Sequence, residues 1–195
     1  MSRHAESLPP AYFEECYAAD PDPWRFATSD YERAKYAATL AALPRPRYRS
    51  AFEPACSIGV LTRALAERCD SLLASDLVGT ALHAARARCA ACPWVTVRQA
   101  AMPAQWPEGR FDLIVLSEFL YFLDRDDLAA LVVKVGEAIE PGGDIVLVHW
   151  LGPTDYPLSG DEAADGFMAG AAGFASVIGA ERWPEYRIDV LRAGA

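Results

Sequence analysis

The chain has 195 residues, of which 52% are apolar and 23% charged, and its net charge is −9 from 18 basic and 27 acidic residues. This length and composition allow a buried core without disulfides or metals, and they exclude disordered and membrane-spanning classes. An acidic surface repels phosphate backbones and anionic lipid, so neither a nucleic acid nor a membrane is expected as a partner. The first ten residues lack the basic and then apolar pattern of an export signal.

Five cysteines occur at irregular spacing, and an odd number of them does not make a disulfide framework. A reducing, cytoplasmic setting is therefore expected. Cys89 and Cys92 form a CxxC pair, but no second pair and no nearby histidine completes a zinc site, so no metal is expected.

Residues 1–49 differ in pattern from the rest of the chain. Prolines and aromatic residues come first, and one helix follows, for which Ser29 and Glu32 form a capping box. The helix ends before Pro44 and presents one apolar face: Tyr36, Leu40 and Leu43. We take residues 1–49 as an N-terminal helical cap segment over a ligand site, and residues 50–195 as the main domain.

From residue 50, short apolar runs alternate with helical stretches. The predicted strands are Ala51–Glu53, Ser71–Ser75, Val95–Arg98, Phe111–Ser117 and Asp144–His149. The predicted helices between them are Val60–Glu67, Leu77–Cys89 and Asp126–Ala138. Alternation of this kind indicates an α/β fold with a parallel sheet covered by helices on both faces.

The pattern changes near the end of the chain. Ser159 and Glu162 form a second capping box before a short helix. Two further strands, Phe174–Ala180 and Tyr186–Leu191, are separated by only five residues, which is too few for a helical crossover. They must therefore pair in antiparallel fashion, whereas the usual dinucleotide-binding sheet is parallel throughout.

The loop after the first strand is the expected ligand site, because ligands of open α/β sheets lie at the carboxyl ends of the strands. It has small residues at 55, 57 and 59, with Glu53 before it and Asp76 ending the next strand, at the spacing of an acid that binds ribose hydroxyls. Considered separately, the small residues are also typical of a simple tight turn, and Asp76 is also typical of a helix N-cap. A carboxylate at position 53 opposes a pyrophosphate but suits an ammonium group, which favours S-adenosylmethionine (SAM) over NAD.

These features resemble the class I SAM-dependent methyltransferases. The match includes Glu53–Gly59, Asp76, Phe111–Glu118 and Pro141–Gly143, although Ala55 and Ser57 stand where two loop glycines are usual. More closely, the chain resembles the nodulation protein S type. The motifs of that resemblance are Asp20–Phe26, Tyr31–Tyr36, Glu53–Gly59, His149–Trp150 and Asp155–Asp161.

The resemblance implies a Rossmann-like sandwich with a mostly parallel seven-stranded sheet, an antiparallel C-terminal hairpin and an N-terminal helical cap. It implies SAM as cofactor, S-adenosylhomocysteine as product, and N-methylation of an amino sugar at the end of a chito-oligosaccharide, or of another small amine. Three alternatives stay open: an O-methyltransferase of a small hydroxylated acceptor, a non-catalytic scaffold, and an NAD-dependent oxidoreductase. The oligomeric state is not predicted.

Site roles follow from the resemblance by position. Glu53, Ala55, Cys56 and Gly59 would contact the methionine part of SAM. Asp76 and Leu77 would bind the ribose, Ala101 and Met102 would flank the adenine, and Ser117 would line the methyl-transfer site. Arg33 would pair with the SAM carboxylate, and the rings of Trp24 and Tyr31 would stack on the adenine or on a sugar.

An amine attacks a methyl group only with a free lone pair, so a general base is useful. Glu118 and His149 are the candidates at the carboxyl ends of strands, and Tyr121 lies near them in sequence. Glu118 would otherwise cap the next segment or pair with an arginine, His149 would be a hydrogen-bonded spacer, and Tyr121 would belong to the core. Residues 151–161 offer Asp155, Tyr156 and Asp161 to an acceptor, which we expect to be small and polar or cationic.

Overall fold

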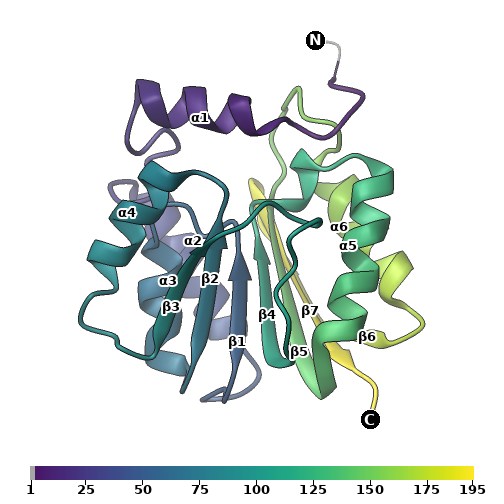
Figure 1. Ribbon diagram of the computed structural model, residues 1–195. Helices are drawn as coiled ribbons and strands as arrows, with labels where there is room; N and C mark the ends of the chain where they lie inside the picture. Colours follow the sequence, from purple (N-terminus) through teal and green to yellow (C-terminus); the bar gives the residue numbers. More distant parts are fainter. Residues whose placement is uncertain (1–2) are drawn as a thin grey trace. The chain divides into compact units, whose positions relative to one another are not determined.

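The computed structural model describes residues 3–195 (Figure 1). The chain forms two compact units. One unit is Pro9–Ala101, and the other consists of the residues up to Leu8 together with Met102–Ala195. The proposed division of roles between residues 1–49 and 50–195 stays a prediction.

The unit Pro9–Ala101 contains three parallel strands in the order β3-β2-β1. Its elements in chain order are α1 (Pro10–Ala19), α2 (Asp30–Ala42), β1 (Ala51–Pro54), α3 (Val60–Leu65), η1 (Ala66–Arg68), β2 (Leu72–Asp76), α4 (Gly79–Arg88) and β3 (Val95–Gln99). Every residue of β1 is buried, as an inner strand requires, and Ala51 of β1 pairs with Leu72 of β2. The carboxyl ends of β1 and β2 therefore lie side by side, at Pro54 and Ser75.

Helix α2 begins as predicted, because the Ser29 hydroxyl accepts a hydrogen bond from the backbone N–H of Glu32 at 3.4 Å. The predicted apolar face is wrong in part: the helix buries Glu32, Lys35 and Thr39 instead. Lys35 Nζ lies 2.9 Å from a carboxylate oxygen of Glu32. Pairing of the two charges within one helix turn offsets part of the desolvation that burial imposes on each. Apolar periodicity does not detect such a face.

Helix α1 was not predicted. It begins with Pro10 at its first position, where the missing N–H of proline costs nothing, but it buries only Tyr17. A helix with one buried residue has no apolar stripe, so the periodicity of the sequence does not reveal it.

The second unit contains four strands in the order β4-β5-β7-β6. Its elements are β4 (Phe111–Ser117), η2 (Leu120–Phe122), α5 (Arg125–Ala138), β5 (Ile139–Trp150), α6 (Gly160–Ala171), β6 (Ala175–Arg182) and β7 (Tyr186–Ala193). Strands β4 and β5 are parallel, while β7 is antiparallel to both β5 and β6. The predicted antiparallel hairpin is thus confirmed, with a shorter connection because β6 extends to Arg182.

The predicted fold class is confirmed. The sheet has seven strands and is covered by helices. It is mostly parallel and ends, at the C-terminus of the chain, in an antiparallel pair. The strand β4 has the predicted bounds, and its inner residues Leu113–Leu116 are fully buried. Strand β5 begins earlier than predicted, at Ile139, because the Pro141–Gly143 segment continues the strand.

Gly59 allows a close approach between two helices of the first unit. It precedes α3 with φ of +77°, and a Cβ built there would lie 2.8 Å from the Cα atom of Ala85 in α4. The contact distance excludes a side chain unless α4 shifts, and the positive φ would add backbone strain.

Gly59→Ala should therefore lower the free energy of unfolding by about 2–4 kcal/mol, from left-handed strain and overpacking together. Gly79→Ala is the matched control, because a Cβ atom at this position in α4 would have no other atom within 4 Å. Urea denaturation should show the control unchanged or slightly stabilised. Equal midpoints for the two variants would contradict this packing.

Candidate functional site

The loop between β1 and α3 has an unusual backbone. Three alternate residues have positive φ: Ala55 at 56°, Ser57 at 52° and Gly59 at 77°. A residue with a side chain loses roughly 1–2 kcal/mol in the left-handed region, so two non-glycine residues there need support from their surroundings. The loop thus places two non-glycine residues in a backbone conformation that glycine adopts most readily.

Asp76 supports this loop from the end of β2. One carboxylate oxygen of Asp76 accepts the backbone N–H of Ser57 at 2.8 Å, and the other accepts the N–H of Val78 at 2.9 Å. Burial raises the pKa of Asp76, and hydrogen bonds from Val78, Ser57 and Leu77 oppose that rise. Because each carboxylate oxygen has a second lone pair, Asp76 can still accept hydrogen bonds from a ligand.

Helix α1 reaches the same loop through Tyr17. The Tyr17 hydroxyl and the Ser57 hydroxyl are hydrogen-bonded. Burial, and then the charge of Asp76, raise the pKa of Tyr17 far above its usual value, so this phenol stays neutral. The Tyr17 side chain also packs in an apolar cluster with Ile58 and Val78. Sequence reasoning missed Tyr17, because it comes from the helix that periodicity does not reveal.

Glu53 lies at the end of β1 with 3% of its surface exposed. Within residues 3–195, its Oε2 atom has no hydrogen-bond partner. Burial raises the pKa of Glu53 to about 8, the nearby Thr62 hydroxyl opposes the rise, and the charge of Asp76 adds to it. At neutral pH the side chain is therefore mostly protonated, and a ligand cation beside it would restore the carboxylate. A buried carboxyl of this kind fits the ammonium group of an amino acid.

The remaining predicted residues of this unit lie in several settings. Cys56 is buried beside the same loop, and burial raises the pKa of its thiol well above the usual value. Trp24 stacks on Phe26, with ring centroids 5.8 Å apart. Tyr31 lies over Lys35, whereas Arg33 is largely exposed and pairs with Asp30 at 2.6 Å. The cofactor contacts of these residues, and of Leu77 and Ala101, stay predictions.

A second cluster of polar and aromatic groups lies in the other unit, around Glu118. The backbone of Glu118 has φ of 54°, and its N–H donates to the carbonyl of Val148 at 2.8 Å. Its Oε2 atom accepts the Tyr121 hydroxyl at 2.6 Å and the backbone N–H of Trp150 at 2.9 Å. The carboxylate thus holds together the ends of β4 and β5 and the turn η2. Strained backbone of this kind is frequent at functional sites.

The structure brings the three predicted catalytic candidates together. The Tyr121 ring meets the fully buried His149 ring edge to face, with centroids 5.6 Å apart. Tyr156 stacks on Tyr121 with ring centroids 5.3 Å apart, and Phe122 contacts Tyr156 with centroids 4.7 Å apart. Ser117 ends β4 next to this cluster, and Met102 belongs to the same unit. The catalytic roles of Glu118, Tyr121 and His149 stay predictions.

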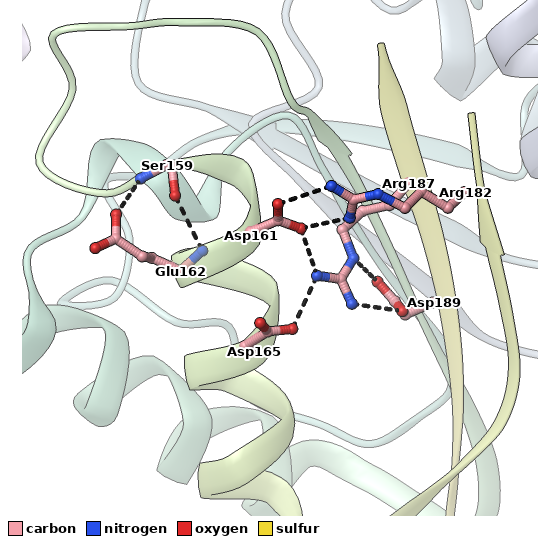
Figure 2. Close-up of polar contacts among 7 residues, drawn as sticks. All are labelled: Ser159, Asp161, Glu162, Asp165, Arg182, Arg187 and Asp189. Carbon is pink, nitrogen blue, oxygen red and sulfur yellow. Dashed lines mark hydrogen bonds and ion pairs between the residues drawn. The ribbon is translucent and has the colours of Figure 1, made fainter. Parts of the chain in front are cut away.

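The segment that carries Tyr156 is anchored on both sides. The N–H of Leu158 donates to the carbonyl of Tyr121, and the N–H of His4 donates to the carbonyl of Asp155. The predicted capping box of Ser159 and Glu162 is present at the start of α6 (Figure 2). These contacts fix residues 151–159 against η2.

Asp161 belongs to a network of ion pairs. Figure 2 shows its carboxylate between two arginines of the hairpin, at 2.7 and 2.9 Å from Arg182 and 2.8 Å from Arg187. These arginines lower the pKa of Asp161 to about 2. Arg187 also pairs with Asp165 and, through two nitrogens, with Asp189. Because its oxygens bind these two arginines, Asp161 anchors α6 to β6 and β7. Its contact with an acceptor stays a prediction.

Residues 3–195 contain no group of three or more metal-binding side chains. Cys89 and Cys92 are free thiols, both buried. Among the described residues, no helix has the length and apolarity needed to cross a membrane.

Comparison with known proteins places the chain in a family. The family model of nodulation protein S (NodS) matches residues 13–148. Nodulation protein S of Rhizobium tropici is 36% identical over 138 residues, which cover 66% of this chain and 55% of the relative. That of Bradyrhizobium diazoefficiens is 35% identical over 132 residues, 64% of this chain and 61% of the relative. The chain thus spans a little over half the length of these relatives.

Two solved structures are also similar. A candidate methyltransferase from Pseudomonas syringae is 40% identical, with a TM-score of 0.72 over 83% of this chain and 98% of that one. The N-methyltransferase NodS from Bradyrhizobium japonicum, in complex with S-adenosylhomocysteine, is 19% identical with a TM-score of 0.84, over 95% of this chain and 99% of that one. The second likeness shows a shared fold.

Glu53→Gln should change how stability depends on pH. Folding raises the pKa of this carboxyl from 4.5 to about 8. The free energy of unfolding is therefore highest below pH 4.5 and falls as the pH rises toward 8, because only the unfolded chain is ionised at Glu53 in that range. The variant does not titrate, so its stability relative to the parent should increase by about 2–3 kcal/mol between pH 5 and 7.5. Urea denaturation at both pH values measures the difference. Parallel stability curves would show that Glu53 is not buried as described.

Asp161→Asn should destabilise the protein at neutral pH. A carboxylate whose pKa is lowered adds stability above its usual value of 3.8 and loses it as the pH falls toward 2. Since 43% of the side chain is exposed, we expect a loss of only about 1 kcal/mol, reduced further in 1 M salt. Asp165→Asn is the control, because Asp165 makes a single, more exposed ion pair with Arg187. A larger effect at position 165 than at 161 would contradict the network.

Proposed function

Because the chain belongs to the nodulation protein S family, we propose that it is a SAM-dependent N-methyltransferase of a small amine. An amino sugar of the chito-oligosaccharide type is the acceptor that the family suggests. The single observation that carries the proposal is the loop of alternate left-handed residues, which is held by Asp76 and follows the buried carboxyl of Glu53, whose Oε2 atom has no hydrogen-bond partner. Five free thiols favour a reducing, cytoplasmic setting.

The residues of the first unit fit SAM group by group. Glu53 would receive the ammonium of the methionine part, since a cation is the partner that its buried carboxyl lacks. Asp76 would accept the ribose hydroxyls with its remaining lone pairs. When bound, SAM supplies a methyl group already activated by its sulfonium.

The second unit would prepare the acceptor. Two donors, the Tyr121 hydroxyl and the Trp150 N–H, hold one oxygen of Glu118 and stabilise its charged form. Glu118 would take one proton from the ammonium of the acceptor, which leaves the nitrogen lone pair free to attack the methyl carbon. The methyl group would pass to this nitrogen as its bond to sulfur breaks, with the electron pair of that bond left on sulfur. The proton taken by Glu118 would then pass to solvent, and the methylated nitrogen would leave as an ammonium.

His149 and Tyr121 would support this base. The His149 ring is fully buried against the edge of Tyr121, so it fixes the direction of the phenol that donates to Glu118. We assign the base to Glu118 because it is only partly buried and therefore accessible to an acceptor, whereas His149 is not.

Glu118→Gln tests the assignment. In a screen of amino sugars and small amines with labelled SAM, we expect the turnover of the best acceptor to fall about 100-fold or more, because the base is lost. The rate of the variant should recover as the pH approaches the pKa of the acceptor amine. Binding of S-adenosylhomocysteine, measured by calorimetry, should be unchanged.

Glu137→Gln is the matched control, since this carboxylate is exposed on α5 and its change should leave turnover at the parent level. Unchanged turnover of Glu118→Gln would overturn the role of Glu118. Methylation of hydroxyl acceptors alone would support the O-methyltransferase alternative. A chain that binds no S-adenosylhomocysteine at millimolar concentration would support the scaffold alternative.

A further inference from the structure

We infer that the acceptor is recognised as a cation by an aromatic cluster beside Glu118, made of Tyr121, Phe122 and Tyr156, with Tyr156 as its accessible member. This inference rests on the proposed function, because it specifies how the same site would select its acceptor. Nothing in the comparisons assigns a role to Tyr156.

The three rings are in mutual contact. Tyr156 stacks on Tyr121 with an interplanar angle of 22°, and it meets Phe122 at 67°. Phe122 in turn meets Tyr121 edge to face, with centroids 4.7 Å apart. The three rings therefore form one compact cluster. Tyr121 and Phe122 come from η2, and Tyr156 comes from the loop after β5.

The cluster ends in a carboxylate. Tyr121 donates its hydroxyl hydrogen to Glu118 at 2.6 Å, so the phenol oxygen lies directly beside the negative charge. A carboxylate is unfavourable beside an ordinary apolar core unless it is hydrogen-bonded or binds a polar ligand. A ring face and a carboxylate together attract a cation, since the quadrupole of the ring and the charge of the acid act in the same direction.

Exposure distinguishes the three residues. Tyr121 is buried, with 6% of its surface exposed, whereas Tyr156 and Phe122 are partly exposed. A ligand that approaches the cluster from solvent would therefore meet Tyr156 and Phe122 before Tyr121. The stack on Tyr121 and the bond between Leu158 N–H and the Tyr121 carbonyl hold Tyr156 in place before any ligand binds. Such preorganisation reduces the entropy lost on binding.

The charge of the site also separates classes of acceptor. An ammonium group gains from both the rings and Glu118, a neutral hydroxyl gains only a hydrogen bond, and a phosphate or carboxylate is repelled. The cluster would thus prefer amines over alcohols of the same shape before any chemistry occurs.

A pair of isosteric probes tests this inference without knowledge of the natural acceptor. Choline carries a quaternary ammonium, and 3,3-dimethylbutan-1-ol has the same shape with a neutral carbon in its place. Binding of each probe to the full chain saturated with S-adenosylhomocysteine is measured by calorimetry. We expect choline to bind at least 10-fold more tightly than the neutral alcohol.

Variants at position 156 locate the preference. Tyr156→Phe keeps the ring, so the logarithm of the affinity ratio of choline to the neutral alcohol should stay at half its parent value or more. Tyr156→Leu removes the ring and should reduce the affinity for choline about 10-fold, with little change for the neutral alcohol. In turnover of an amine acceptor, Tyr156→Leu should raise KM much more than it lowers kcat. Circular dichroism and S-adenosylhomocysteine affinity serve as controls for folding.

Equal affinities of choline and the neutral alcohol for the parent protein would overturn the inference, as would an unchanged preference in Tyr156→Leu. Failure of the proposed function has a different signature, which is the absence of S-adenosylhomocysteine binding in the parent. Preference for the cation without any methyl transfer would leave recognition supported and refute only the catalytic proposal.

Discussion

The loop after β1 depends on the two hydrogen bonds that the Asp76 carboxylate accepts from the backbone. One bond reaches Ser57 in the loop and the other reaches Val78 after β2, so one side chain joins the ends of two neighbouring strands. Tyr17 extends this support to α1 through the Ser57 hydroxyl, and the N–H of Cys56 donates to the carbonyl of Ser75 at 2.8 Å. The positive φ values of Ala55 and Ser57 therefore occur in a loop that is tied to both β2 and α1.

Two carboxyl groups have opposite settings in the two units. Glu53 is buried without a partner for one oxygen, and burial raises its pKa. Glu118 is partly exposed and accepts two hydrogen bonds on one oxygen. A cation beside the buried acid favours its charged form, whereas a partly exposed acid held by two donors is placed to meet an acceptor. This contrast is the physical basis for assigning one acid to the cofactor and the other to the acceptor.

The hairpin that distinguishes this fold from a wholly parallel sheet also holds the start of α6, which follows the loop that carries Tyr156. Arg182 and Arg187 bind Asp161 at the start of α6, directly after the loop that carries Tyr156. The loop is thereby fixed at its end by charge pairs and along its length by backbone hydrogen bonds. Since Arg187 is only 13% exposed and bonds three carboxylates, its pairs are less screened by solvent than ordinary surface pairs.

Much of the fold could be predicted because the strands and most helices have strong local signals. The buried run of β4 and the serine N-caps of α2 and α6 lie where the sequence places them, since apolar continuity and capping depend on neighbouring residues alone. Helix α1 and the turn η2 could not be predicted, because short elements with few buried residues are stabilised by contacts distant in sequence. The buried pair of Glu32 and Lys35 was missed for a related reason: the pattern of apolar residues does not show which charges neutralise each other.

By itself, the sequence determined the order of the strands and of most helices, the antiparallel ending and the acids at positions 53, 76 and 118, because each depends on spacing along the chain. Only the tertiary structure decided the surroundings of these acids. It showed Glu53 buried without a partner for one oxygen, Asp76 bonded to the loop and Glu118 bonded to Tyr121. The physical reason is that a carboxylate acts through the donors that surround it, and in a folded chain those donors come from residues far apart in sequence.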